Sequence, residues 1–293
     1  MKKNIGLHLL FLLLTVSCSS DNYKGNSNAC FSNQNPETML HSGETREYIL
    51  YIPSSYRSSN PVPVVLNFHG FGGSASEYSS YADMREEAEA NSFILVYPQG
   101  SCLNNTSHWN PCPVGGDNKS TADDLGFIDS LISKISNEYS IDNQRVYAVG
   151  YSNGAMMAYG LANYKSNLIA AVASVSGVQL SCGSSNSSPM PVVHLHGTSD
   201  DVIPYEGNND YNSAQSVLDY WINFNNTAIQ PDVNSESTVE HYIYSQGDDG
   251  VRVEHFKYIG GEHIWFNTNY QGKTTSQIIW NFVSRFDRNG LRD

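Results

Sequence analysis

Hydrophobic and polar positions along the chain follow two alternating patterns. Short apolar runs rich in β-branched and aromatic residues predict strands at residues 47–52, 62–67, 93–97, 146–149, 170–175, 192–195, 241–245 and 251–258. Segments between them, with apolar residues at helical spacing, predict helices at residues 77–90, 122–139, 155–163, 214–224 and 275–286. Strands interleaved with helices predict an α/β fold with a mostly parallel central sheet and helices on both faces. Ligands bind such a sheet at the carboxyl ends of its strands, so the residues there are the first candidates for chemistry.

One predicted strand passes directly into a helix through Gly150-Tyr151-Ser152-Asn153-Gly154. The central residue of such a turn takes a strained backbone conformation that lifts its hydroxyl clear of the sheet. The glycines two before and two after it prevent side-chain collisions. Ser152 is therefore the candidate nucleophile. The alternative is a turn of glycine and serine that connects strand to helix and carries no chemistry.

Two further strand ends carry titratable residues. Asp200 and Asp201 follow the predicted strand 192–195, and His263 follows the last predicted strand. The order Ser152, Asp200, His263 is the order in which α/β-hydrolases carry their triad, where a carboxylate orients the imidazole that accepts the serine proton. These three residues are the predicted catalytic set.

A glycine-rich loop, residues 69–73, follows the predicted strand 62–67. Such a loop can direct a backbone N–H at a developing oxyanion, and the residue after the nucleophile can supply a second. The predicted donors are the backbone N–H groups of Phe71 and Asn153. The alternative is that these glycines only form a turn. His194 and His196 could face the same way as metal ligands, but no helpful third ligand accompanies them, and we expect no metal.

The first 17 residues have a basic start and an apolar middle, as in a secretory signal, and are too short to span a bilayer. The sequence up to Cys18 resembles a lipobox, which implies cleavage before Cys18 and lipidation of its sulfur; ordinary signal cleavage nearby is the alternative. Residues 18–40 are then a polar tether and residues 41–293 the hydrolase domain. We expect an exported protein, lipid-anchored to the bacterial cell envelope at the outer membrane or cell surface.

Acidic residues outnumber basic ones by 29 to 16, which gives a formal net charge of −13. Removal of residues 1–17 takes away Lys2 and Lys3 and no acid, so the charge becomes −15. Such a surface repels nucleic acid and anionic lipid headgroups, so we expect no nucleic-acid partner and membrane contact only through the lipid anchor. We also expect a monomer.

Four cysteines remain besides the lipidation candidate. An even number in an exported chain predicts two disulfides, for which the sequence allows three pairings. A short loop favours Cys102 with Cys112, which would leave Cys30 with Cys182. No Cys-x-x-Cys occurs, so a thiolate metal site is not expected.

These motifs together resemble the secreted polyhydroxybutyrate-depolymerase-like esterases, a group that includes feruloyl and acetyl xylan esterases. The resemblance covers residues 45–286 and rests on blocks such as 64–74, 150–156, 196–205 and 260–265. It implies an α/β-hydrolase fold without a large cap domain and ester hydrolysis by a serine without a cofactor. The family pattern places the triad acid at Asp200, although Asp201 stands where the family often has proline.

The predicted substrate is an ester-bearing polymer or oligomer. Segment 178–190 has only 13 residues where many relatives insert a cap, so the cleft is expected to be open. Loop 101–121, with Trp109, and also Trp265 are candidates for substrate contact. The first hypothesis is removal of feruloyl or acetyl groups from polysaccharide, and the second is depolymerisation of polyhydroxyalkanoate. A non-catalytic binding lipoprotein and a peptidase are weaker alternatives, because the motifs are intact and the chain has no spare length for an accessory domain.

Overall fold

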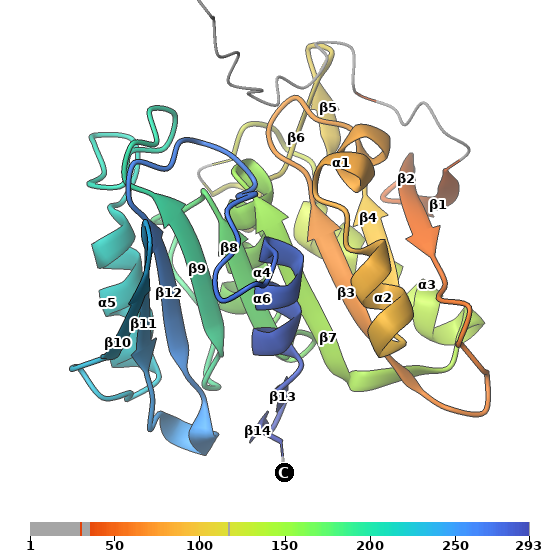
Figure 1. Ribbon diagram of the computed structural model, residues 1–293. Helices are drawn as coiled ribbons and strands as arrows, with labels where there is room; N and C mark the ends of the chain where they lie inside the picture. Colours follow the sequence, from red (N-terminus) through yellow and green to blue (C-terminus); the bar gives the residue numbers. More distant parts are fainter. Residues whose placement is uncertain (1–29, 31–35, 117, 293) are drawn as a thin grey trace, which may run out of the picture.

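The computed structural model describes residues 30, 36–116 and 118–292. In this part of the chain, ten strands form one sheet (Figure 1). In order across the sheet they are β1 (Glu37–His41), β2 (Glu44–Tyr51), β4 (Ile94–Pro98), β3 (Val62–Phe68), β7 (Ile141–Tyr151), β8 (Ala171–Val175), β9 (Val192–Gly197), β12 (Val253–Tyr258), β11 (Val239–Tyr244) and β10 (Asp232–Glu236).

The middle of the sheet is parallel. Strands β4, β3, β7, β8, β9 and β12 pair in parallel, and antiparallel pairs flank them at both edges. The carboxyl ends of β3, β7, β9 and β12 therefore lie at one edge of the sheet. The prediction of a mostly parallel α/β sheet is confirmed.

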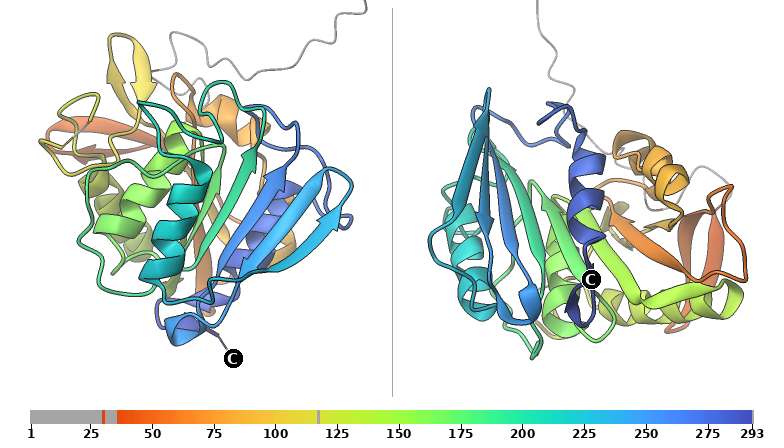
Figure 2. Two further views of the ribbon diagram at one scale, coloured as in Figure 1. Left: turned by 90° about the vertical axis from the view of Figure 1, so that its left-hand side faces the viewer. Right: turned by 60° about the horizontal axis from the view of Figure 1, so that its bottom comes forward.

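Helices cover both faces of the sheet, as the two views in Figure 2 show. On one face lie α1 (Ala75–Tyr81), α2 (Arg85–Asn91) and α6 (Thr275–Val283), and on the other α3 (Asp124–Glu138), α4 (Asn153–Tyr164) and α5 (Ala214–Phe224). Successive side chains of β3 point to opposite faces of the sheet, so Val64 and Leu66 pack into one hydrophobic core and Val65 into the other.

The single helix predicted at residues 77–90 is wrong, because the chain breaks it into α1 and α2 between Ala82 and Met84. The carbonyl of Ala82 accepts from the Asn67 amide at 3.2 Å and the Tyr97 hydroxyl at 3.0 Å, and the Tyr97 oxygen accepts from the Met84 N–H at 3.1 Å. Buried side chains from the sheet thus satisfy the backbone groups that the break releases.

Several elements lie where the hydrophobic pattern gives no signal. Strand β1 begins at Glu37, within the predicted tether 18–40, and ends at His41, and all five residues of β10 are exposed. Short elements outside the sheet are β5 (Ser101–Leu103), β6 (Thr106–His108), β13 (Phe286–Asp287), β14 (Gly290–Leu291) and the 3₁₀ turn η1 (Asp248–Gly250). The predicted signal peptide, Cys18 and most of the predicted tether lie outside the described residues. No helix in the described part of the chain is long and apolar enough to cross a membrane.

The predicted disulfide between Cys102 and Cys112 is wrong. Cys30 pairs with Cys102, and Cys112 pairs with Cys182. Cys102 lies in hairpin β5–β6, after which the chain turns inward through buried residues to Cys112. The hairpin separates the two sulfurs, so each bonds to a partner at least 70 positions away in the sequence.

Candidate active site

Ser152 stands in the sharp turn between β7 and α4. Its backbone has φ 55° and ψ −123°, a strained conformation for a residue with a side chain. A Cβ at Gly150 would lie 2.2 Å from the carbonyl oxygen of Gly154, and one at Gly154 would lie 2.1 Å from that of Phe68. The two glycines are therefore required by close backbone approach on both sides of the serine.

The structure brings Ser152, Asp200 and His263 together from three strand ends. His263 Nε2 lies 2.9 Å from Ser152 Oγ, and His263 Nδ1 lies 2.8 Å from Asp200 Oδ2. Asp200 is buried, whereas the neighbouring Asp201 is exposed. Of the two neighbouring acids, Asp200 makes the contact to the imidazole.

Neighbours on two other strands hold the loop that carries His263. The hydroxyl of Tyr151 donates to the backbone carbonyl of His263 at 2.8 Å, and the two rings lie 5.0 Å apart between centroids. The hydroxyl of Ser176 donates to the carbonyl of Ile264 at 3.0 Å. The imidazole is thus fixed relative to the ends of β7 and β8.

Four donors surround the Asp200 carboxylate. Oδ1 accepts from the backbone N–H groups of Val202 at 3.0 Å and Ile203 at 2.8 Å. Oδ2 accepts from His263 and also faces Nε2 of His196 at 3.2 Å. Burial alone would raise the pKa of Asp200, but the hydrogen bonds from His196 and His263 outweigh it and hold the pKa below its ordinary value. The carboxylate is ionised near neutral pH and can stabilise a charged imidazole.

The glycine-rich loop after β3 lies beside the serine. Phe71 and Asn153 line the same cavity as Ser152, and neither backbone N–H donates to another described residue. Both groups are therefore available to an oxygen that enters the cavity.

His69 fixes the orientation of this loop. Its Nδ1–H donates to the Gly70 carbonyl at 2.7 Å, and its Nε2 accepts from the Gly100 N–H at 2.9 Å. Burial lowers the pKa of His69 to about 4, so the ring is neutral near pH 7 and Nε2 can accept. Because the carbonyl and N–H of a trans peptide point in opposite directions, fixing the Gly70 carbonyl also fixes the Phe71 N–H.

Trp109 holds the glycine-rich loop 69–73 through a hydrogen bond. Its ring is fully buried, and its indole N–H donates to the His69 carbonyl at 3.0 Å. The Asn153 side-chain amide bonds to both backbone groups of Trp109, at 2.7 and 3.2 Å. Trp109 therefore links the nucleophile turn to the glycine-rich loop. Trp265 packs edge-on against Tyr78 and is not among the described residues that line the cavity.

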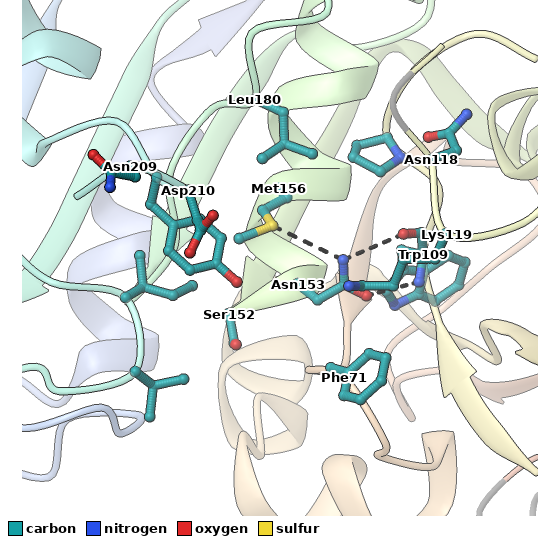
Figure 3. Close-up of a pocket in the computed structure, with 14 residues that line it drawn as sticks. Phe71, Trp109, Asn118, Lys119, Ser152, Asn153, Met156, Leu180, Asn209 and Asp210 are labelled. Carbon is teal, nitrogen blue, oxygen red and sulfur yellow. Dashed lines mark hydrogen bonds between the residues drawn. The ribbon is translucent and has the colours of Figure 1, made fainter. Parts of the chain in front are cut away.

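The cavity at Ser152 has a volume of about 600 Å³ (Figure 3). Polar and apolar side chains both line it; Trp109, Pro111, Asn118 and Lys119 form one wall, and residues 202, 203 and 209–211 form the other. Its lining residues are Phe71, Trp109, Pro111, Asn118, Lys119, Ser152, Asn153, Met156, Leu180, Val202, Ile203, Asn209, Asp210 and Tyr211. Met156, which belongs to the core, thus also borders the cleft.

A buried carboxylate anchors the wall formed by loop 101–121. Asp124 accepts from Arg46 at 2.7 Å, from the Ser101 hydroxyl at 2.7 Å and from the backbone N–H of Asn110 at 2.8 Å. The loop that was predicted to select substrate is therefore held in place at its base.

His194 and His196 lie in the sheet interior, fully buried beside His255. Within the described residues, no group of three or more His, Cys, Asp or Glu side chains could hold a metal ion. These histidines instead form hydrogen bonds with tyrosines, with one another and with backbone carbonyls.

Residues 46–229, more than half of the chain, match the family described as Esterase PHB depolymerase. The chain belongs to this family. The predicted resemblance is confirmed, and so is the prediction of a carboxylic ester hydrolase, since the relatives below are esterases.

This esterase is 27% identical to Feruloyl esterase D of Neurospora crassa, over 84% of this chain and 83% of that protein. It is 29% identical to the Bifunctional acetylxylan esterase/xylanase XynS20E of Neocallimastix patriciarum over 85% of this chain, but spans only 34% of that longer protein. Among solved structures it resembles the Acetyl xylan esterase from Aspergillus awamori, with a TM-score of 0.64 and 16% identity over 82% of this chain and 94% of that chain. The structural likeness shows the α/β-hydrolase fold, as predicted.

Sequence reasoning missed His196 as a neighbour of the carboxylate and Trp109 as a support of the glycine-rich loop. The spacing of four residues between His196 and Asp200 was visible, but only the turn after β9 brings the ring back to the carboxylate.

Proposed function

We propose that this chain is a serine esterase that removes acetyl or feruloyl groups from polysaccharide, with Ser152, His263 and Asp200 as its catalytic triad. The observation that carries the proposal is the continuous contact from serine through imidazole to a buried carboxylate, at 2.9 and 2.8 Å. This is the arrangement that activates a hydroxyl for attack on an ester.

In the proposed mechanism, His263 takes the proton of Ser152 as the hydroxyl oxygen attacks the ester carbonyl. The charged imidazole is stabilised by Asp200, and the backbone N–H groups of Phe71 and Asn153 donate to the oxyanion. His263 then protonates the departing alcohol, which leaves an acyl-enzyme. Water repeats the attack and releases the acid, and Ser152 recovers its proton.

The polysaccharide part of the proposal is supported by the names of the relatives, which act as feruloyl and acetylxylan esterases. It is also supported by the segment between β8 and β9, which contains no helix that could close over the cleft. The family description favours a second candidate, depolymerisation of polyhydroxyalkanoate.

We further propose that the protein is exported, with a lipid on Cys18 and residues after it as a tether. The two disulfides support export, because such bonds persist in oxidising compartments. A Cys18→Ala variant should move from the membrane fraction to the soluble fraction and lose incorporation of labelled palmitate. Unchanged membrane association and labelling would refute the anchor.

The catalytic assignment is tested with Ser152→Ala and 4-nitrophenyl acetate. The turnover number should fall by a factor of about 10³ to 10⁶ with the fold intact. Ser199→Ala, which alters an exposed serine beside the acid, is the matched control and should keep its activity. Near-normal turnover of Ser152→Ala would overturn the assignment.

The neighbouring acids offer a second matched pair. Asp200→Asn should reduce turnover by about 10⁴, because the amide cannot stabilise the charged imidazole. Asp201→Asn should be close to wild type, because the Asp201 side chain is exposed. The reverse result would transfer the role to Asp201.

A substrate panel separates the candidate functions. Acetylated xylan, methyl ferulate, polyhydroxybutyrate film and a peptide amide should be compared at equal enzyme concentration. Release of acetate or ferulate at rates well above film erosion supports the polysaccharide proposal. Faster erosion of the film would favour the depolymerase.

A further inference from the structure

The cavity at Ser152 does not end at Leu180. Beyond this residue and Tyr211 it is continued by two smaller hollows, of about 370 and 240 Å³, which share Leu180 with it and with each other. Figure 3 shows Asn209 and Asp210 on this side of the serine, opposite Lys119 and Trp109.

The side chains that line the two hollows are mainly neutral hydrogen-bonding groups. Gln179, Ser181, Asn208, Asn209, Asp210 and Asn212 form this polar arm of the cleft. No described lysine, arginine or histidine lines either hollow. Among the described residues that line them, the only carboxylate is that of Asp210, in the smaller hollow.

Some polar groups of the arm have no protein partner among the described residues. The side-chain oxygen of Gln179 is buried without a hydrogen bond. The side chains of Asn209 and Asp210 are exposed and make no hydrogen bond to another described residue. Unpartnered amide and carboxylate groups in a groove favour a ligand that is rich in hydroxyls and uncharged.

We propose that the polar arm binds the sugar chain of the substrate while the ester is held at Ser152. This inference rests on the proposed polysaccharide esterase function. It places the sugar chain on the side of the cleft that Leu180 and Tyr211 border. A carbohydrate suits the arm because its hydroxyls can both donate to the exposed carboxylate of Asp210 and accept from the exposed amide of Asn209.

The test is an Asn209→Ala, Asp210→Ala double variant. The KM for acetylated xylan should rise about tenfold, since two hydrogen-bonding groups are lost, and it should rise several times more than the KM for 4-nitrophenyl acetate, which is too small to reach along the polar arm. Asp232→Ala with Asn234→Ala changes the same residue types on exposed edge strand β10 and should alter neither value.

An unchanged KM for acetylated xylan would overturn the inference. So would an equal rise in the KM for 4-nitrophenyl acetate. Failure of the proposed function has a different signature, because the wild type itself would then not hydrolyse the polymer. Titration of xylohexaose into Ser152→Ala gives a readout without turnover: binding that the double substitution weakens supports the arm, and binding that it leaves unchanged opposes it.

A second inference comes from the buried network behind the carboxylate. The Tyr159 oxygen lies 2.8 Å from His194 Nδ1, and His194 Nε2 lies 3.1 Å from His196 Nδ1. His196 Nε2 lies 2.9 Å from the Ile203 carbonyl and 3.2 Å from Asp200 Oδ2. A continuous row of hydrogen bonds thus leads from Tyr159 to the acid that contacts His263.

Donor and acceptor counting fixes the proton positions in this row. Both neighbours of His196 Nε2 are acceptors, so Nε2 carries a proton. In a neutral ring Nδ1 then accepts, which requires His194 Nε2 to donate. Burial keeps the pKa of His194 well below its ordinary value, so His194 Nδ1 accepts in turn from the Tyr159 hydroxyl.

The geometry points to His196 as a positioning residue of the esterase. Its Nε2–H holds the same oxygen, Oδ2, that accepts from His263, and its bond to the Ile203 carbonyl closes the turn that follows Asp200. The Ile203 N–H meanwhile donates to Oδ1 at 2.8 Å, so one turn and one ring fix the whole carboxylate.

Two substitutions test this role. His196→Leu removes the donor, and kcat for 4-nitrophenyl acetate should fall about tenfold with KM within about twofold. His196→Gln keeps an N–H donor at similar reach and should retain most of the activity. Equal activity in both variants and wild type would overturn the role, as would an equal loss in both.

Nitrogen-15 NMR of the histidine rings gives a second readout, whose main measurement is made on the wild type. The wild type should show His196 protonated at Nε2, and Tyr159→Phe, which removes the last donor of the row, should change the ring signals of His194. A neutral His196 ring protonated at Nδ1 would overturn the inference.

Discussion

The disulfide between Cys112 and Cys182 joins two walls of the cleft. Cys112 follows Pro111, which lines the cavity at Ser152, and Cys182 follows Leu180 and Ser181, which line the polar arm. We expect a Cys112→Ser, Cys182→Ser variant to lose stability and to bind polymeric substrate less well.

The size of the stability loss follows from the loop that the bond closes. Cys112 and Cys182 are separated by 70 positions. In the chain-entropy description, a cross-link of this length removes about 4 kcal/mol of unfolded-state entropy. Domains are commonly stable by only about 5–15 kcal/mol, so a loss of this size is easily measured by urea unfolding.

The other disulfide provides a matched control. Cys30 and Cys102 are separated by 72 positions, so a Cys30→Ser, Cys102→Ser variant should lose a similar free energy of unfolding. The two variants should differ in kinetics. Only the Cys112→Ser, Cys182→Ser variant should show a raised KM for acetylated xylan, because only that bond holds the wall that carries the polar arm.

Two results would refute this reasoning. A stability loss below about 1 kcal/mol for the Cys112→Ser, Cys182→Ser variant would mean that chain entropy is not the main contribution. A KM for acetylated xylan that rises equally in both variants would mean that the effect is a general loss of order and not a displaced cleft wall.

Three further predictions concern the site and its supports. Gly154→Ala places a Cβ 2.1 Å from the Phe68 carbonyl, so it should cost about 3 kcal/mol or more and abolish esterase activity; a stable, active variant would contradict the close approach. Trp109→Phe removes a hydrogen bond and should lower kcat about fivefold, whereas Trp221→Phe, whose indole N–H has no described partner, should leave kcat unchanged; equal effects would contradict the support role. In urea unfolding, the free energy of unfolding should fall as the pH is lowered from 6.5 to 4, by up to about 1.4 kcal/mol per pH unit for each buried histidine ring with a lowered pKa. The reason is that these rings bind a proton in the unfolded chain but stay neutral in the folded one; a flat profile would contradict it. These rings are His69, with a pKa of about 4, His255, with a pKa of about 3, and His194.

The sequence alone determined the elements that local patterns specify. The buried strands and the turn around Ser152 depend on residues only a few positions apart, and β-branched runs and glycine spacing report such short-range constraints. The predicted order of Ser152, Asp200 and His263 was sufficient to suggest the reaction, because parallel strands deliver their carboxyl ends to one edge.

Local sequence patterns gave no information about elements that form only through contacts between residues far apart in the chain. Strand β10 is exposed at every position and forms only because β11 offers it an edge, and the helix break after α1 depends on Asn67 and Tyr97 from the sheet. Which cysteines pair, which of two acids meets the imidazole and what His196 touches all depend on the relative placement of strands that are far apart in the chain. That placement is set by the packing of two cores against one sheet, so only the tertiary structure could decide it.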